Sequence, residues 1–121
     1  MSNVVLRPDD MLPLTPAVFH ILLALADGEK HGYSIMQEVS RITNETIKMG
    51  PGTLYGTLKR MLEAHLIEET EERPDPTMDD ERRRYYRLTA FGERVAQAEA
   101  GRLALLLNVA HSKKLVGGAT A

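Results

Sequence analysis

Cysteine and tryptophan are absent from this sequence of 121 residues, and aromatic residues make up only 5% of it. Without cysteine the chain forms no disulfide, no thiolate zinc site and no thiol nucleophile. No apolar run reaches the roughly 18 residues that a membrane-spanning helix needs. The segment from Met1 to Met11 contains charged residues where a secretion signal would have an apolar stretch. We therefore expect a cytoplasmic protein with no membrane segment, no metal and no cofactor.

Basic charge is also scarce, because 15 Lys and Arg residues stand against 17 Asp and Glu residues and give a net charge of −2. This balance does not favour a nucleic-acid binder. The acidic residues are concentrated, however: residues 62–81 hold nine of them, and Arg73 is the one basic residue in that stretch. Outside it, fourteen basic residues accompany eight acidic ones. One surface of the protein can therefore be positive although the whole chain is not.

The length and the 43% content of hydrophobic residues predict one domain with a substantial core. Three amphipathic helices are expected: one between Thr15-Pro16 and Asp27-Gly28, one over about 31–43, and one that begins at Pro51. In each helix the apolar residues fall on one face: Val18, Ile21, Leu22 and Leu25; Ile35, Met36, Val39 and Ile42; Leu54, Leu58, Met61 and Leu62. These apolar faces must pack against one another to be buried away from water.

Residues 67–73 and 83–88 are expected to form the two strands of a hairpin, joined by a loop of roughly ten residues. The first strand is acidic and the second is basic, so opposite charges would face each other across the pair. A two-stranded hairpin that follows three helices is a wing.

A last helix is expected over 90–112, with Thr89 as its N-cap. The stretch from Leu103 to Ala110 is apolar on almost every side. A helix of that kind is normally buried on every side, which a single helix beside a small domain cannot achieve. We therefore expect it to pack against a second copy of the chain. The predicted dimer interface comprises Phe91, Val95, Ala98, Leu103, Leu105, Leu106, Leu107 and Val109.

The order of these elements predicts a mainly α-helical fold with a small β-hairpin. It consists of a winged helix-turn-helix over 15–88 and a dimerisation helix over 89–112. Residues 1–14 are expected to be a mobile or loosely docked arm, and residues 113–121 a flexible tail.

Three motifs accompany this order of elements: His31-Gly32-Tyr33-Ser34-Ile35-Met36, then Gly50-Pro51-Gly52-Thr53-Leu54-Tyr55 with Leu58-Lys59-Arg60, and finally Arg82-Arg83-Arg84-Tyr85-Tyr86-Arg87-Leu88-Thr89. Together they resemble the PadR family of bacterial transcriptional regulators, over about residues 14–92. The resemblance implies a homodimer that binds a partly palindromic operator, usually as a repressor relieved by a small molecule or a stress signal. The chain lacks the larger C-terminal region of the members that respond to phenolic acids, so their effector is not assigned to it.

The third helix has the features of a recognition helix. At about 100° per residue, its apolar stripe leaves a polar face opposite, with Tyr55 and Thr57 at the borders. The residues on that polar face are Thr53, Gly56, Lys59, Arg60 and Glu63. Short polar residues followed by cations suit a helix whose start enters a major groove, and its first N–H groups suit a phosphate. The predicted DNA contacts are Tyr33, Ser34, Lys48, Pro51, Gly52, Thr53, Tyr55, Gly56, Thr57, Lys59, Arg60, Arg82, Arg83 and Arg84.

Several of these residues have a second interpretation. Tyr55 is equally suited to a half-buried place in the core, and Tyr33 to filling a gap between helices. Glycine in the middle of a helix costs about 1 kcal/mol of stability relative to alanine. Gly56 is therefore either kept for a close approach of DNA or is a surface glycine without function. Acidic residues 79–81 precede the three wing arginines, so some of those arginines are expected to pair with residues 68–72 instead of DNA.

Other classes of function find less support. The four histidines, His20, His31, His65 and His111, have no nucleophile motif around them and no metalloprotease spacing. A metal site of His65 with Asp79 or Asp80 has no recognised ligand spacing, and we expect no catalysis. A winged helix that binds only proteins is the alternative function. A small-molecule effector pocket is placed at the dimer seam, near Phe91, Val95, Leu103 and Leu106, with a dry packed interface as the other interpretation.

Overall fold

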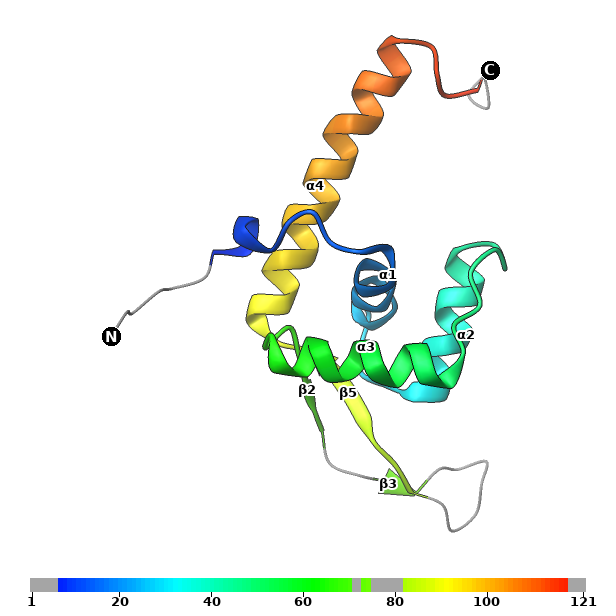
Figure 1. Ribbon diagram of the computed structural model, residues 1–121, viewed down its shortest axis with the longest axis vertical. Helices are drawn as coiled ribbons and strands as arrows, with labels where there is room; N and C mark the ends of the chain where they lie inside the picture. Colours follow the sequence, from blue (N-terminus) through cyan, green and yellow to red (C-terminus); the bar gives the residue numbers. More distant parts are fainter. Residues whose placement is uncertain (1–6, 71–72, 75–81, 118–121) are drawn as a thin grey trace.

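The computed structural model describes residues 7–70, 73–74 and 82–117 (Figure 1). Its elements in chain order are η1 (Pro8–Met11), α1 (Pro16–Leu25), β1 (Lys30–His31), α2 (Gly32–Ile42), α3 (Pro51–Glu63), β2 (Ile67–Glu69), β3 (Arg73–Pro74), β4 (Arg82–Arg83), β5 (Tyr85–Leu88) and α4 (Ala90–Ser112). The predicted fold class, mainly helical with a small antiparallel sheet, is confirmed.

Short-range capping sets the ends of the helices. The Thr15 hydroxyl accepts a hydrogen bond from the Val18 N–H at 3.4 Å, and the Thr89 hydroxyl accepts one from the Gly92 N–H at 2.9 Å. Both threonines satisfy N–H groups that the first turn of a helix leaves without partners. The predicted starts of α1 and α4 are therefore confirmed. The predicted end of α4 at Ser112 is confirmed as well.

The core is built from the predicted apolar faces of the helices. Its fully or almost fully buried members include Ile21, Leu22, Leu25, Ile35, Val39, Leu54, Leu58 and Met61, with Tyr86 from β5 and Val95 from α4. Gly92 lets α4 come close to the turn between α3 and β2, because a Cβ atom on Gly92 would overlap the backbone carbonyl of Leu66. The start of α4 is thereby fixed against the domain.

The sheet differs from the prediction in one respect. Strands β2 and β5 pair antiparallel as expected, with Glu68 opposite Arg87, and their side chains form an ion pair at 2.7 Å. The two residues of β1 add a third strand, so the order is β1-β5-β2. The prediction of a hairpin with only two strands was therefore wrong, because a third strand pairs with β5. A strand of two residues between two helices carries no alternation that a sequence pattern can detect.

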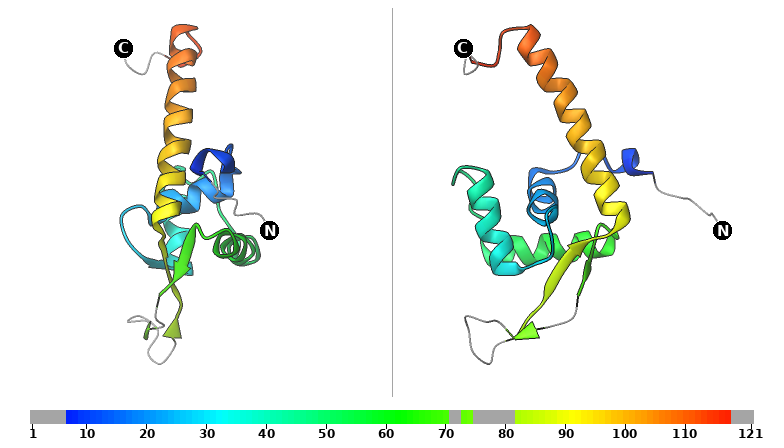
Figure 2. Two further views of the ribbon diagram at one scale, coloured as in Figure 1. Left: turned by 90° about the vertical axis from the view of Figure 1, so that its left-hand side faces the viewer. Right: turned by 180° about the vertical axis from the view of Figure 1, so that it is seen from behind.

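The N-terminal segment is also more ordered than predicted. Residues 8–11 form η1, which lies beside α4 in both views (Figures 1 and 2). Met11, Leu12 and Leu14 pack against the core. The expectation of a mobile or loosely docked arm was wrong for residues 7–14, since local sequence does not reveal contacts with a helix some 85 residues away. Residues 1–6 lie outside the described residues.

The second half of α4 extends beyond the rest of the molecule (Figure 2). Leu105 is 66% exposed there, and its apolar neighbours Leu106, Leu107 and Val109 are exposed as well. The first half packs on the domain, where Val95 is fully buried and Phe91 is partly buried against the core. Val95 was therefore wrongly placed in the dimer interface, because its own chain already covers it. Residues 113–117 of the predicted tail follow α4 and are exposed or partly exposed. Residues 118–121 lie outside the described residues.

None of the described helices is both long enough and apolar enough to cross a membrane.

Candidate nucleic-acid interface

The exposed face of α3 carries most of the residues that the sequence assigns to it. Thr53, Lys59 and Arg60 are exposed, as are Pro51 and Gly52 at the start of the helix. In the part of the chain that the structure describes, neither Lys59 nor Arg60 has a carboxylate partner. The positive charge of this face is therefore available to an external anion.

Thr57 was wrongly assigned to this face, because it is fully buried. Its hydroxyl donates to the carbonyl of Thr53 at 2.7 Å and accepts from Nη2 of Arg60 at 3.2 Å. A border position is buried or exposed according to the neighbouring helix, which periodicity alone does not specify. Thr57 thus supports the Arg60 guanidinium instead of contacting a ligand.

Gly56 is only partly exposed, and the nearest atom to a Cβ built on it would be Nη1 of Arg60 at 3.8 Å. That separation is an ordinary contact, so nothing within the described chain requires glycine there. A role of Gly56 in close approach to DNA remains a prediction.

Tyr55 combines the two interpretations that the sequence allows. Its side chain is 48% exposed, yet a Cβ atom built on Gly32 would overlap its hydroxyl. The ring therefore lies on the backbone at the start of α2 while one face remains open to solvent. Tyr33 is 50% exposed, so at least half of it is open to solvent. Contact of either tyrosine with a phosphate remains a prediction.

His31 has a structural role that the sequence analysis missed. Its Nδ1 accepts a hydrogen bond from the Ser34 N–H at 3.2 Å, and the Ser34 hydroxyl lies 3.1 Å from Nε2. The ring also stacks edge-on against Tyr85, with 5.4 Å between centroids. The backbone N–H of Ser34, a predicted DNA contact, is therefore already bonded within the chain. Histidine is an uncommon N-cap, so the residue type did not indicate that His31 caps α2. The only signal in the sequence is its position directly before Gly32, the first residue of that helix.

The loop that leads into α3 holds Lys48 in an exposed position. The Thr43 hydroxyl ties this loop to α2, since it donates to the Val39 carbonyl at 2.7 Å and accepts from the Ile47 N–H at 3.2 Å. Lys48 thus follows directly on an anchored residue and precedes the start of α3.

The described part of the wing comprises the paired strands β2 and β5 and the short pair β3 and β4. The Arg84 guanidinium lies 3.4 Å from the Glu69 carboxylate, which agrees with the expectation that some wing arginines pair with acidic residues. Arg82 and Arg83 form β4, but their side chains are not described, and the acidic residues 79–81 lie outside the described residues. Contact of the wing with DNA remains a prediction.

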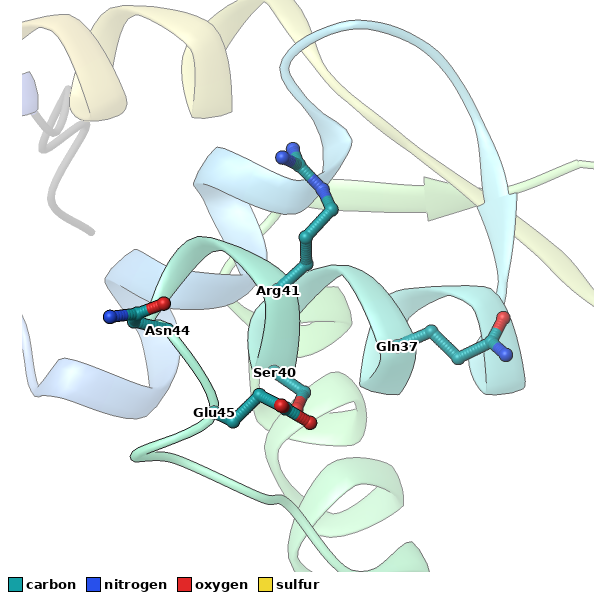
Figure 3. A pocket seen from close by; sticks show the side chains of 5 residues that line it. All are labelled: Gln37, Ser40, Arg41, Asn44 and Glu45. Atoms are coloured by element: carbon teal, nitrogen blue, oxygen red, sulfur yellow. The ribbon is translucent and has the colours of Figure 1, made fainter.

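A polar hollow of about 470 Å³ lies at the C-terminal end of α2 (Figure 3). The side chains of Gln37, Arg41, Asn44 and Glu45 point in different directions in that view. Arg41 is bound through two hydrogen bonds to Glu38, at 2.9 and 2.7 Å, and hydrogen bonding from Arg41 lowers the pKa of the Glu38 carboxyl. The hollow therefore offers no convergent set of ligands. Within the described ranges no group of His, Asp and Glu is arranged to hold a metal ion. Asp79 and Asp80, which the sequence analysis considered beside His65 without a recognised ligand spacing, lie outside the described residues.

Comparison with known proteins identifies the family. Residues 21–98 match the model of the transcriptional regulator PadR-like family. The transcriptional regulator Rv3488 of Mycobacterium tuberculosis is 44% identical over 73 residues, which cover 60% of this chain and 62% of that protein. This chain spans 22%, 64% and 62% of the length of three curated relatives that it matches.

Solved structures show the same fold. A PadR family transcription regulator from Clostridium difficile R20291 has a TM-score of 0.67 at 22% identity, covering 81% of this chain and 97% of that one. Bacillus subtilis PadR, solved in complex with operator DNA, has a TM-score of 0.59 at 22% identity, covering 75% of this chain and 48% of that one. The family is one of regulators and not of enzymes, as the sequence predicted. Because the matching model covers residues 21–98, more than half of the sequence, the chain belongs to the PadR-like family of transcriptional regulators.

Proposed function

We propose that this protein regulates transcription by binding operator DNA as a homodimer, with α3 in the major groove. The observation that carries the proposal is the exposed face of α3, where Lys59 and Arg60 have no carboxylate partner among the described residues. A helix of 13 residues with small polar residues at its start has the dimensions that groove readout requires.

Contacts to phosphates would surround this helix. Lys48 precedes α3, and the half-exposed residues Tyr33 and Tyr55 lie at the start of α2 and on α3. Phosphate contacts of this kind fix orientation, while contacts to base edges give specificity. The solved complex of Bacillus subtilis PadR with operator DNA supports the same use of this fold.

The dimer would form through the second half of α4. A row of exposed leucines is unusual on a monomer, and a second copy is the partner that covers it without any further protein. Two copies would place two α3 helices on half-sites about 34–36 Å apart. A two-fold arrangement implies a partly palindromic operator, and blocking a promoter implies repression, relieved by an effector or a stress signal.

The test begins with enrichment of random duplexes on the purified protein, followed by fluorescence anisotropy of the selected duplex at two salt concentrations. Affinity is expected to fall steeply as salt rises, because each phosphate contact releases counterions. Lys59→Ala and Arg60→Ala are expected to weaken binding and to reduce the salt dependence by about one contact each. Lys113→Ala, the same loss of charge at the far end of α4, is the control and is expected to bind normally.

Light scattering checks the oligomeric state in the same samples. Leu106→Glu in the exposed part of α4 is expected to give monomers and to weaken duplex binding, with the domain still folded. No selected duplex at either salt concentration, from a folded dimer, would instead favour a protein-binding module. A reporter gene placed behind the selected duplex then distinguishes repression from activation.

A further inference from the structure

An apolar groove lies between the N-terminal segment and the second half of α3. Its volume is about 230 Å³, enough for a molecule of one ring or a short alkyl chain. Met11 and Leu14 come from the N-terminal segment and Val18 from α1. Met61 comes from α3, and Ala64 is the C-cap of that helix. Methionine side chains adapt to ligands of different shape, so one methionine on each side of the groove favours binding of a small apolar group.

Arg60 is the one charged residue among the described residues that line this groove. It is exposed, and its described polar contact is with a neutral group, the hydroxyl of the buried Thr57 at 3.2 Å. A guanidinium without a carboxylate partner forms two parallel hydrogen bonds with an incoming carboxylate. The groove therefore joins an apolar wall to one uncompensated positive charge.

The groove also depends on a part of the chain that the family match does not cover. Met11, Leu14 and Val18 precede residue 21, where that match begins. The Leu14 backbone is fixed by its hydrogen bond to Glu99, so this wall is already in place before any ligand binds.

We propose that this groove binds a small organic monoanion, with its apolar part against Met11 and Met61 and its carboxylate on Arg60. The effect of this anion on DNA binding rests on the proposed function. Arg60 stands at the border between the groove and the exposed face of α3, so a bound carboxylate removes it from DNA. The anion and DNA then weaken each other's binding by the same factor.

The first experiment uses octanoate as the probe and contains no DNA. The protein carries ¹³C-labelled methionine methyl groups, and Met→Leu variants assign the signals of its six methionines. Octanoate is expected to shift the Met11 and Met61 signals in a saturable way and to leave Met36 and Met49, which do not line the groove, unchanged. Octan-1-ol is expected to bind about tenfold more weakly or worse, because it lacks the charge-assisted hydrogen bonds.

Three substitutions separate the roles of the neighbouring residues. Arg60→Gln is expected to reduce octanoate binding to the level of octan-1-ol and also to weaken duplex binding. Lys59→Gln, a matched loss of one charge outside the groove, is expected to weaken duplex binding alone. Ala64→Leu, which fills the groove, is expected to abolish octanoate binding and to leave duplex binding intact.

The second experiment repeats the duplex titration in the presence of octanoate. The duplex affinity of the native protein is expected to fall as octanoate rises, and that of Ala64→Leu to stay constant. Unchanged Met11 and Met61 signals, or equal binding of octanoate and octan-1-ol, overturn the groove proposal whatever the duplex does. A protein that binds octanoate at Arg60 but no selected duplex retains the groove and overturns the proposed function.

Discussion

The carboxylate of Glu99 accepts a hydrogen bond from the backbone N–H of Leu14 at 2.9 Å, across 85 positions of the sequence. Glu99 is 2% exposed, and Arg102 holds the same carboxylate through two hydrogen bonds, at 2.5 and 3.1 Å. A buried carboxylate needs such partners, because an unpaired one is costly to remove from water. This single side chain joins the N-terminal segment to α4, and so places one wall of the groove.

Replacing Glu99 should destabilise the fold more than its place in the middle of a helix suggests. Glu99→Ala leaves the Leu14 N–H without its acceptor, and we expect the free energy of unfolding to fall by about 1–3 kcal/mol. Gln97→Ala, an exposed position on the same helix, is the control and should change stability by less than about 0.5 kcal/mol. Urea unfolding measures both. Equal effects of the two substitutions would contradict a structural role of the Glu99–Leu14 contact.

The same residue should make stability depend on pH. The hydrogen bond from Arg102 is the main reason that the pKa of Glu99 lies below the ordinary glutamate value of 4.5 in the folded protein. The unfolded chain therefore takes up this proton at a higher pH than the folded protein does. The stabilisation is fully present above the unfolded pKa and is lost as pH falls through the folded pKa.

Glu99→Gln isolates this effect, because glutamine still accepts the hydrogen bond from Leu14 but does not titrate. Asp27 and Glu38 also have lowered pKa values, owing to Lys30 and Arg41, so the variant should retain part of the acid sensitivity. We expect the variant to lose less stability than the native protein between about pH 6 and pH 3. Parallel stability curves for the two proteins would rule out a titrating role for Glu99.

Two glycines of α4 offer a matched pair of substitutions. Gly92→Ala would drive a methyl group into the Leu66 carbonyl, and because that atom is backbone, relief requires movement of the whole helix. We expect a loss of at least about 1–3 kcal/mol. Gly101→Ala meets open space on the same helix and should stabilise the protein by about 0.8–1.0 kcal/mol. Thermal unfolding compares them; a Gly92→Ala variant as stable as the native protein would show that α4 does not require this close approach.

The parts of the fold that the sequence predicted are those set by neighbouring residues. The ends of α4 followed from Thr89 and from the helical spacing of apolar residues, and the apolar faces of α1 to α3 followed from periodicity alone. The pairing of β1 with β5 and the contact between Leu14 and Glu99 could not be predicted in this way. Both depend on groups that are far apart in the sequence and leave no local pattern.

The candidate site shows the same division. The exposure of Lys59 and Arg60 followed from their spacing relative to Leu54 and Leu58. The burial of Thr57 did not, because the neighbouring helix decides whether a border residue is covered. Val95 was assigned to the dimer for a related reason: apolar spacing continues along α4, but it does not mark where the helix leaves its own domain.

Gly32 and Tyr55 provide a test of how the phenol is positioned beside the exposed face of α3. Gly32→Ala places a Cβ atom where the Tyr55 hydroxyl and ring edge lie, so the ring must move. We expect this substitution to destabilise the fold by about 1–3 kcal/mol and to weaken duplex binding. In a Tyr55→Ala background the obstacle is gone, and Gly32→Ala should then have no further effect on either measurement. The double-mutant cycle thus yields a coupling energy for the pair, measured once by urea unfolding and once by fluorescence anisotropy. Coupling in unfolding but not in duplex affinity would make Tyr55 a packing residue alone, whereas coupling in both would place its phenol against DNA.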